Sequence, residues 1–109
     1  YRLLSTLILK IMIKYLKNEN FNDEIKEGIT LVDFYADWCG PCQRMGAILE
    51  ECENLNVLKV NTDEHQDLAI SFGVMSIPTL ILFKDGQEMG KKIGLMSKSE
   101  VVAFVKEHE

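Results

Sequence analysis

The chain has few of the residues that mark several protein classes. Among 109 residues there are three cysteines, two prolines and one tryptophan, and twelve basic residues face seventeen acidic ones. So few cysteines, in an odd number, exclude a disulfide-rich scaffold. The scarcity of proline, with seven glycines, excludes collagen-like and low-complexity chains. A net charge of -5 gives no attraction to phosphate backbones, so we expect no nucleic-acid partner.

What is present is the composition of one folded domain. Apolar residues make up 47% and charged residues 27% of the chain, and this length allows a single core. A core of this size needs no disulfide to hold it together. We therefore expect the cysteines to be reactive rather than structural, and the protein to work in a reducing compartment, the cytoplasm.

Residues 1–11 form an apolar stretch that we treat as an N-terminal extension of uncertain origin. Ser5, Thr6 and Lys10 interrupt it, and it is too short to span a bilayer. It also lacks the unbroken apolar middle and small-residue cleavage site of a secretory signal. We expect no membrane association and place the domain at residues 12–109.

Hydrophobic periods of two and 3.6 residues alternate along the rest of the chain. They predict strands at residues 11–16, 29–35, 57–60, 79–84 and 88–93, with helices at 20–25, 42–53, 66–72 and from 97 onward. Asn20 and Ser97 are expected to cap helices, and Asp85-Gly86 to form a hairpin turn. The order predicts an α/β fold in which a mixed sheet of about five strands is flanked by about four helices.

The motif Trp38-Cys39-Gly40-Pro41-Cys42 lies where a predicted buried strand ends and a helix begins. Cysteines at this spacing around a first helical turn close a disulfide with little backbone movement, and Pro41 is tolerated there. Free amide groups and the positive end of the helix dipole favour a thiolate at Cys39, which we expect to be open to solvent and nucleophilic. Cys42 falls on the apolar stripe with Met45, so we expect it to be sheltered and to attack only a disulfide already formed on Cys39.

Two other interpretations of the cysteine pair are a zinc half-site and a pair of inert core residues. A structural zinc site needs four ligands, and Cys52, His65 and His108 form no second close pair. Ten helical residues separate Cys52 from Cys42 by about 15 Å, too far for a disulfide. We therefore expect no metal, and Cys52 to be a buried free thiol.

Two charged residues lie within predicted strands of a sheet that is covered on both faces. Asp33 interrupts an apolar run, and burial would raise the pKa of its carboxyl into the range useful for proton transfer near neutral pH. Lys59 lies in another strand and could offset the charge of a buried Asp33. The alternatives are a solvated strand face for Asp33 and a surface position for Lys59.

Several separated motifs resemble the thioredoxin family, agree with it in order and spacing, and cover about residues 12–109. They are Asp33-Phe34-Tyr35-Ala36-Asp37-Trp38-Cys39-Gly40-Pro41-Cys42, Ser76-Ile77-Pro78-Thr79, Phe83-Lys84-Asp85-Gly86 and Gly94. The resemblance implies the thioredoxin fold and an enzyme that reduces protein disulfides by dithiol–disulfide exchange. The Gly-Pro pair between the cysteines is the version found in the reductants of the family.

The resemblance also implies roles for individual residues. Cys39 would attack substrate disulfides and Cys42 would resolve the mixed disulfide. Asp33 would accept the proton of Cys42, with Lys59 modulating it, and Pro78 would follow a cis peptide bond and pack against the disulfide. The substrate surface would comprise Trp38, Gly40, Pro41, Ile77, Pro78 and Gly94. Without the resemblance, Trp38 and Ile77 would be assigned to the core.

The implied partners are protein disulfides and a flavin-dependent thioredoxin reductase that draws on NADPH. No cofactor is expected beyond the redox-active pair Cys39 and Cys42, and we expect a monomer. Two alternatives are a non-enzymatic docking module with a redox-sensitive clasp, and an exported or membrane-tethered reductant that uses residues 1–11. Retention of Asp33, both cysteines and Pro78 favours the enzyme, because docking alone needs no buried proton carrier.

Three features depart from the family pattern. Ala47 stands where a proline usually bends the long helix, with Gly46 before it, and Gln43 replaces a common lysine. The link from this helix to the next strand is also about one turn shorter than usual. We therefore expect the helix to end near Glu53.

Overall fold

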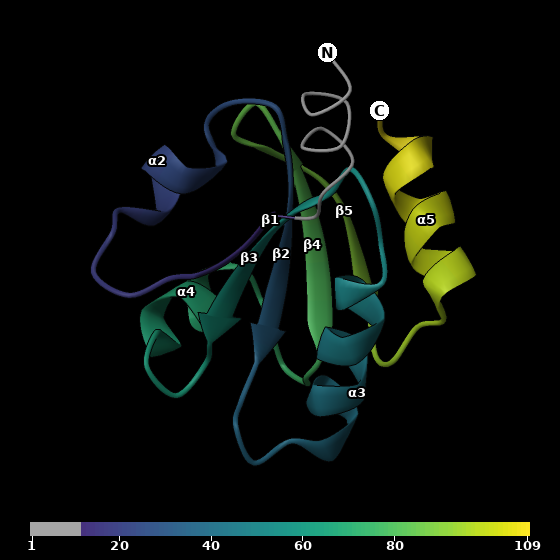
Figure 1. Ribbon diagram of the computed structural model, residues 1–109. Coiled ribbons are helices and arrows are strands. Elements are labelled where there is room, and N and C mark those ends of the chain that lie inside the picture. Colours follow the sequence, from purple (N-terminus) through teal and green to yellow (C-terminus); the bar gives the residue numbers. More distant parts are fainter. Residues whose placement is uncertain (1–11) are drawn as a thin grey trace.

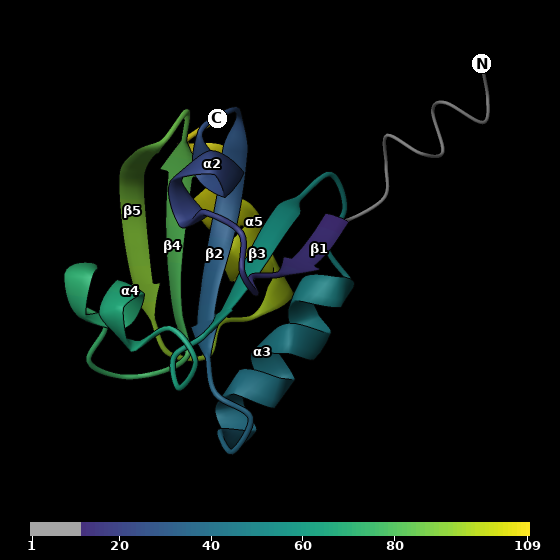
Figure 2. The same ribbon diagram turned by 90° about the vertical axis from the view of Figure 1, so that its left-hand side faces the viewer.

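The computed structural model describes residues 12–109, so the predicted extension at residues 1–11 lies outside the described residues. Its sheet consists of β1 (Met12–Tyr15), β2 (Ile29–Tyr35), β3 (Asn56–Asn61), β4 (Thr79–Lys84) and β5 (Gln87–Ile93). The strand order is β1-β3-β2-β4-β5, as Figure 2 shows. β1, β3 and β2 are parallel, whereas β4 and β5 pair antiparallel. The predicted mixed sheet is confirmed, with β2 at its centre.

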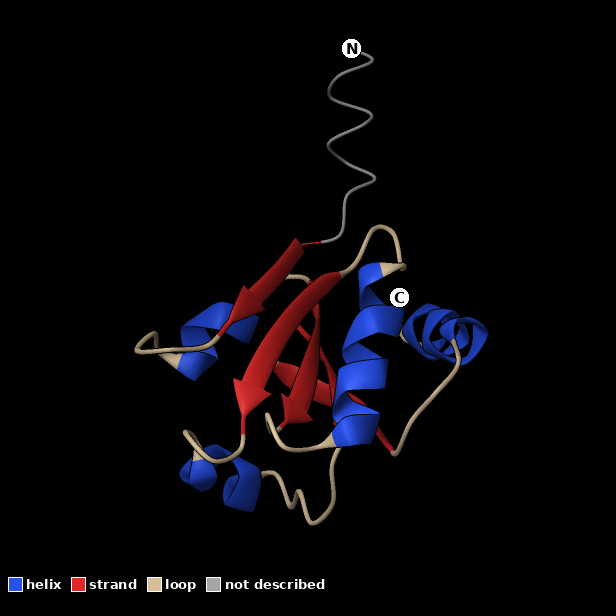
Figure 3. Cartoon of the chain, turned by 60° about the horizontal axis from the view of Figure 1, so that its bottom comes forward, coloured by secondary structure: helices blue, strands red, loops and turns tan. Residues whose placement is uncertain are grey.

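Helices cover both faces of the sheet, as predicted. Figure 1 shows α2 (Phe21–Ile25) and α4 (Gln66–Ser71) on one side of the sheet, with α3 (Gly40–Glu50) and α5 (Lys98–Glu107) on the other. Figure 3 shows the same layers from a tilted view. Within residues 12–109, no helix has the length and apolar character needed to cross a membrane.

Local signals in the sequence account for most of the element ends. The Asn20 side chain accepts a hydrogen bond from the Asp23 amide at 3.2 Å, which caps α2. Ser97 and Glu100 form the predicted capping box of α5. Asp85 and Gly86 both have positive φ, the backbone of the predicted hairpin turn.

Helix α3 ends earlier than predicted, at Glu50 rather than near Glu53. The amides of Glu51 and Cys52 donate to carbonyls only three residues back, which tightens the last turn. Asn54 then adopts a positive φ of 57°, and Leu55 enters the core. The burial of Leu55 in the core ends the helix early, and the hydrophobic periodicity of the sequence does not indicate this burial.

Alternate residues of the central strands point into two separate apolar layers. Leu31 on β2 packs with Met45 and Leu49 of α3, whereas Val32 and Phe34 pack on the opposite face. Because side chains alternate along a strand, Asp33 lies on the same face as Leu31, toward α3. The central strand of the sheet therefore carries a buried carboxyl group on the face that is covered by the helix bearing the cysteines.

We expect Leu49→Ala to lower the free energy of unfolding by about 2–5 kcal/mol. Leu49 is fully buried between α3 and the sheet, so truncation leaves a cavity under the helix. Urea unfolding measures the change. Arg44→Ala, at an exposed position of the same helix, should cost less than about 0.5 kcal/mol. Equal losses in the two variants would contradict the packing described here.

Candidate active site

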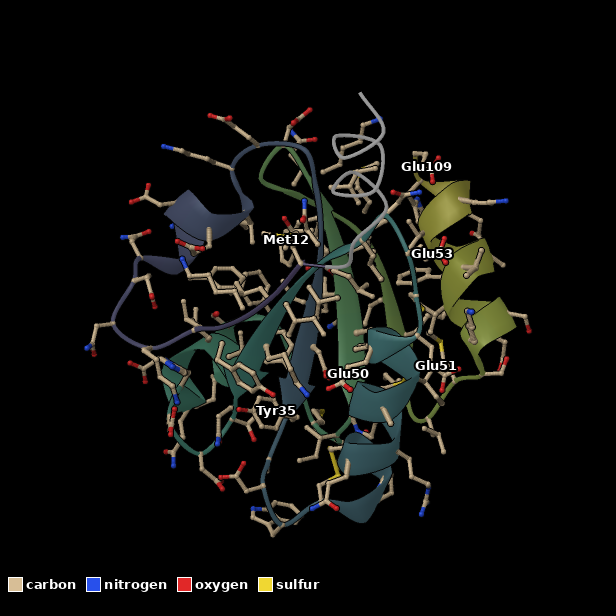
Figure 4. The ribbon with its side chains drawn as sticks, viewed as in Figure 1. Met12, Tyr35, Glu50, Glu51, Glu53 and Glu109 are labelled. Carbon is tan, nitrogen blue, oxygen red and sulfur yellow. A yellow bond between two sulfur atoms is a disulfide. The ribbon has the colours of Figure 1, made fainter. Side chains whose placement is uncertain are left out.

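The cysteine pair lies at the junction between β2 and α3. Cys39 is the N-cap of α3 and forms a disulfide with Cys42, with 5.2 Å between their Cα atoms. Figure 4 draws this bond in yellow beside the first turn of the helix. The Cys42 amide donates a hydrogen bond to Cys39 Sγ at 3.2 Å. A negative charge on Cys39 Sγ would meet the same amide and the positive end of the helix dipole.

Both cysteines are buried, which corrects the expectation that Cys39 is open to solvent. Cys39 is 5% exposed and Cys42 is 2% exposed. The disulfide packs with Ala36 and is covered by Tyr35, at the end of β2, and by Ile77, which is distant in the sequence. What distinguishes the two sulfurs is the surface that each residue adjoins. Cys39 lines an apolar groove, whereas Cys42 lines a separate polar pocket.

The apolar groove has a volume of about 550 Å³. Four of the predicted substrate-binding residues line it, namely Trp38, Gly40, Pro41 and Ile77. Trp38 is 73% exposed, so its assignment to the core from the pattern alone is wrong. Its indole Nε1 donates to Asp63 Oδ2 at 3.0 Å, which holds the ring at the surface. The groove therefore offers apolar surface beside Cys39.

The groove also includes residues that the sequence reasoning missed. They are Thr62, Ala69, Val74, Met75 and Ser76. Met75 is 96% exposed, an unusual position for a large apolar side chain. The available signal was an apolar pair, Val74 and Met75, in the loop directly before Ser76-Ile77-Pro78. Hydrophobic periodicity predicts helices and strands and assigns no role to apolar residues in a loop.

The other two predicted surface residues, Pro78 and Gly94, lie next to each other and outside the groove lining. The Ile77–Pro78 peptide bond is cis, as the resemblance implies. The Ile77 carbonyl oxygen lies 3.9 Å from Cys39 Sγ. The Gly94 amide donates to the Pro78 carbonyl at 2.8 Å, and Gly94 has a φ of +96°, which favours glycine. Neither residue lines the groove itself.

Asp33 and Lys59 form a buried ion pair in the sheet. They are paired in register on β2 and β3, with 3.4 Å between Lys59 Nζ and Asp33 Oδ2. Asp33 is fully buried and Lys59 is 9% exposed, so the surface alternatives for both residues are wrong. Burial raises the pKa of the Asp33 carboxyl to about 6, and the Lys59 ammonium opposes part of that rise.

The polar pocket connects this ion pair with the disulfide. It has a volume of about 320 Å³, and both Cys42 and Lys59 line it. Gly46 and Ala47 of α3 also line it, the latter at the position where the family usually has proline. Gln43, which replaces a common lysine, donates to the Asp37 carbonyl at 3.1 Å. The pocket gives Cys42 a polar side, away from the apolar groove.

The zinc interpretation finds no support in the described part of the chain. Among residues 12–109, no three His, Cys, Asp or Glu side chains gather as metal ligands. Cys52 is buried and free, as predicted, and burial raises the pKa of its thiol. The redox chemistry therefore rests on the pair at the start of α3.

We expect Asp33→Asn to change how stability depends on pH. An acid whose pKa rises from 3.8 to about 6 on folding binds its proton more tightly in the folded state. The wild-type protein should therefore lose stability as the pH rises from about 4 to about 6, by on the order of 2–3 kcal/mol. Urea unfolding between pH 4 and 7 should show this loss in the wild type and not in Asp33→Asn. Parallel curves for the two proteins would contradict the burial argument.

Comparisons with known proteins agree with this geometry. A family model described as Thioredoxin matches residues 12–107. Thioredoxin of Chlamydia caviae is 46% identical over 101 residues, which cover 89% of this chain and 99% of that protein. Thioredoxin of Staphylococcus saprophyticus is 43% identical over 96 residues, which cover 84% of this chain and 92% of that protein.

Solved structures share the fold. A mutant thioredoxin from Halobacterium salinarum superimposes with a TM-score of 0.75 at 31% identity, over 91% of this chain and 90% of that chain. A chain from a structure of thiol resolution in yeast mitochondrial 1-Cys peroxiredoxin via glutathione/thioredoxin systems gives 0.77 at 33% identity, over 87% and 94%. The chain belongs to the thioredoxin family and is a thiol–disulfide oxidoreductase that carries its exchange chemistry on Cys39 and Cys42.

Proposed function

We propose that Cys39 is the attacking thiol and Cys42 the resolving thiol in the reduction of protein disulfides. The Cys39 thiolate attacks one substrate sulfur, the substrate disulfide breaks, and its other sulfur leaves as a thiolate. Cys42 then attacks Cys39 Sγ, releases the second substrate thiol and leaves the Cys39–Cys42 disulfide. The observation that carries this assignment is the hydrogen bond from the Cys42 amide to Cys39 Sγ at the start of α3.

Asp33 is the proton acceptor for Cys42 in this proposal. Resolution requires the Cys42 thiolate, and Cys42 is buried where desolvation disfavours that charge. A carboxyl with a pKa of about 6 is mostly ionised at neutral pH and still basic enough to take a proton. Lys59 keeps the Asp33 charge compensated from the polar pocket that it shares with Cys42.

Substrate polypeptides dock in the apolar groove beside Cys39. Trp38, Pro41, Met75 and Ile77 offer apolar contacts to the side chains that flank a substrate disulfide. No cofactor is needed, because the electrons travel as two thiols. A flavin-dependent reductase that draws on NADPH would reduce the pair again, so that the protein passes electrons to its substrates. The free, buried thiol of Cys52 fits a reducing compartment, the cytoplasm.

The division of labour between the cysteines predicts different outcomes for their replacement. With excess dithiol, the wild-type protein should speed the reduction of an unrelated disulfide protein, measured as released thiol. Cys39→Ser should abolish this activity. Cys42→Ser should also lose turnover but accumulate a mixed disulfide with the substrate, seen by mass spectrometry. Cys52→Ser, which removes a thiol outside the site, serves as the control and should keep the wild-type rate.

Equal reduction rates for the wild type and Cys39→Ser would contradict the enzyme assignment and favour a docking module. If the mixed disulfide accumulated in Cys39→Ser, on Cys42, and not in Cys42→Ser, the assigned roles would be reversed. Both results can be obtained without knowing the natural substrate, because the assay uses an unrelated disulfide protein.

The role of Asp33 predicts a selective defect in the second step. General base catalysis contributes roughly 10²–10⁴-fold, and we expect Asp33→Ala to slow resolution at the lower end of that range. The first attack, which depends on Cys39, should change much less. Quenched-flow measurement of the mixed disulfide separates the two rates. An unchanged resolution rate would contradict the proton-acceptor role.

A further inference from the structure

The Lys59 ammonium is surrounded by groups from three other elements, β1, β2 and α3. Its Nζ lies 3.4 Å from Asp33 Oδ2, 4.6 Å from the centre of the Tyr35 ring and 5.6 Å from the centre of the Tyr15 ring. On the helix side it faces Gly46, where an added Cβ would lie only 3.0 Å from Nζ. These groups therefore surround the ammonium beside Asp33, and Lys59 also lines the polar pocket.

The strand register explains why these groups meet. Tyr15 of β1 pairs with Lys59 of β3, and Lys59 pairs with Asp33 of β2. Tyr35 lies two residues after Asp33 on the same strand and so faces the same side of the sheet. The two tyrosine rings contact edge to face, with 6.2 Å between their centres.

The position of this ammonium matters because Asp33 has no other compensation. Among residues 12–109, neither oxygen of the Asp33 carboxylate has a hydrogen-bond partner. An uncompensated buried carboxylate is strongly disfavoured, so the distance to Lys59 controls how readily Asp33 ionises. Aromatic faces attract a cation without adding a charge of their own. Burial and the nearby Asp37 raise the pKa of Tyr35 to about 12, so its ring stays neutral at working pH.

We propose that Tyr15, Tyr35 and Gly46 form a slot that holds the Lys59 ammonium beside Asp33 and so sets the pH at which Asp33 accepts the Cys42 proton. These three are positioning residues, since they act through Lys59. Tyr35 also packs against the disulfide, so Tyr35→Phe, which keeps that packing, is its matched control. The inference rests on the proposed role of Asp33 in resolution. Tyr15 and Gly46 lie outside the motifs that resemble the thioredoxin family. Tyr35 lies within one of these motifs, but the resemblance gives it no role in the site.

Other ionisable groups also face the polar pocket that contains the slot. Cys42 and Glu50 line it from α3, and Asp37 lines it from the loop after β2. Figure 4 labels Tyr35 beside the end of β2 and Glu50 on α3. Glu50 and Asp37 are exposed, so water and salt screen their effect on Asp33, whereas the enclosed ammonium of Lys59 is screened far less.

A carbon-13 NMR titration of the Asp33 carboxyl in the oxidised protein tests the slot directly. Tyr35→Leu removes the nearer ring and should move the Asp33 midpoint upward by about one pH unit, because an opposite charge at this range lowers an acid's pKa by roughly 1–3 units. Tyr35→Phe keeps the aromatic face and should stay at the wild-type midpoint. Tyr15→Leu should cause a smaller upward shift, since its ring lies farther away.

Gly46→Ala tests the helix side of the slot without weakening the fold. Alanine is the better helix former, so α3 should be retained. The added Cβ should push the ammonium away by a fraction of an ångström and raise the Asp33 midpoint by roughly a few tenths of a pH unit. In a Lys59→Met background, the same substitution should produce no further shift, because the displaced charge is absent.

The rate of mixed-disulfide resolution should follow the titration. In Tyr35→Leu the low-pH limb of the profile of resolution rate against pH should move to higher pH by the same amount. In Tyr35→Phe the profile should match that of the wild type. A wild-type Asp33 midpoint in Tyr35→Leu, or an equal effect of Gly46→Ala with and without Lys59, would overturn the slot. A failure of the proposed proton-acceptor role of Asp33 would appear separately, as an unchanged resolution rate in Asp33→Ala.

Discussion

The chemistry of this protein depends on one hydrogen bond, from the Cys42 amide to Cys39 Sγ at the first turn of α3. It exists because β2 ends at Tyr35 and the chain turns directly into the helix, so that Cys39 becomes the N-cap. An N-cap side chain normally satisfies a free amide with an oxygen atom. Here a sulfur does so, and the interaction that caps the helix also stabilises the charge that a nucleophilic thiol needs.

The disulfide separates two environments with different chemistry. On one side, an apolar groove that includes Trp38 and Met75 is suited to polypeptide side chains. On the other side, a polar pocket holds Lys59 against the buried carboxyl of Asp33. A buried ion pair is a weak source of stability, because desolvation offsets most of the attraction. Its presence at the centre of the sheet is therefore consistent with the proton transfer that we propose for Asp33.

Much of the architecture could be predicted from local patterns. The strands, the Asn20 and Ser97 caps and the Asp85-Gly86 turn all lie where residue type and spacing place them. Helix α3 ends at Glu50 rather than near Glu53, because the packing of Leu55 in the core ends the helix before its hydrophobic periodicity ends. Without the family resemblance Trp38 would be assigned to the core, whereas a hydrogen bond to Asp63, distant in sequence, holds it at the surface.

The sequence by itself determined the redox pair, since the spacing of Cys39 and Cys42 around a first helical turn is a local property. It also marked Asp33 and Lys59 as charges in strands that should be buried. Only the tertiary structure decided that these two residues are neighbours in register, and that Tyr15, Tyr35 and Gly46 surround the ammonium. The reason is physical: strand order and register are set by packing across the whole sheet, and no local pattern along one strand specifies its partner.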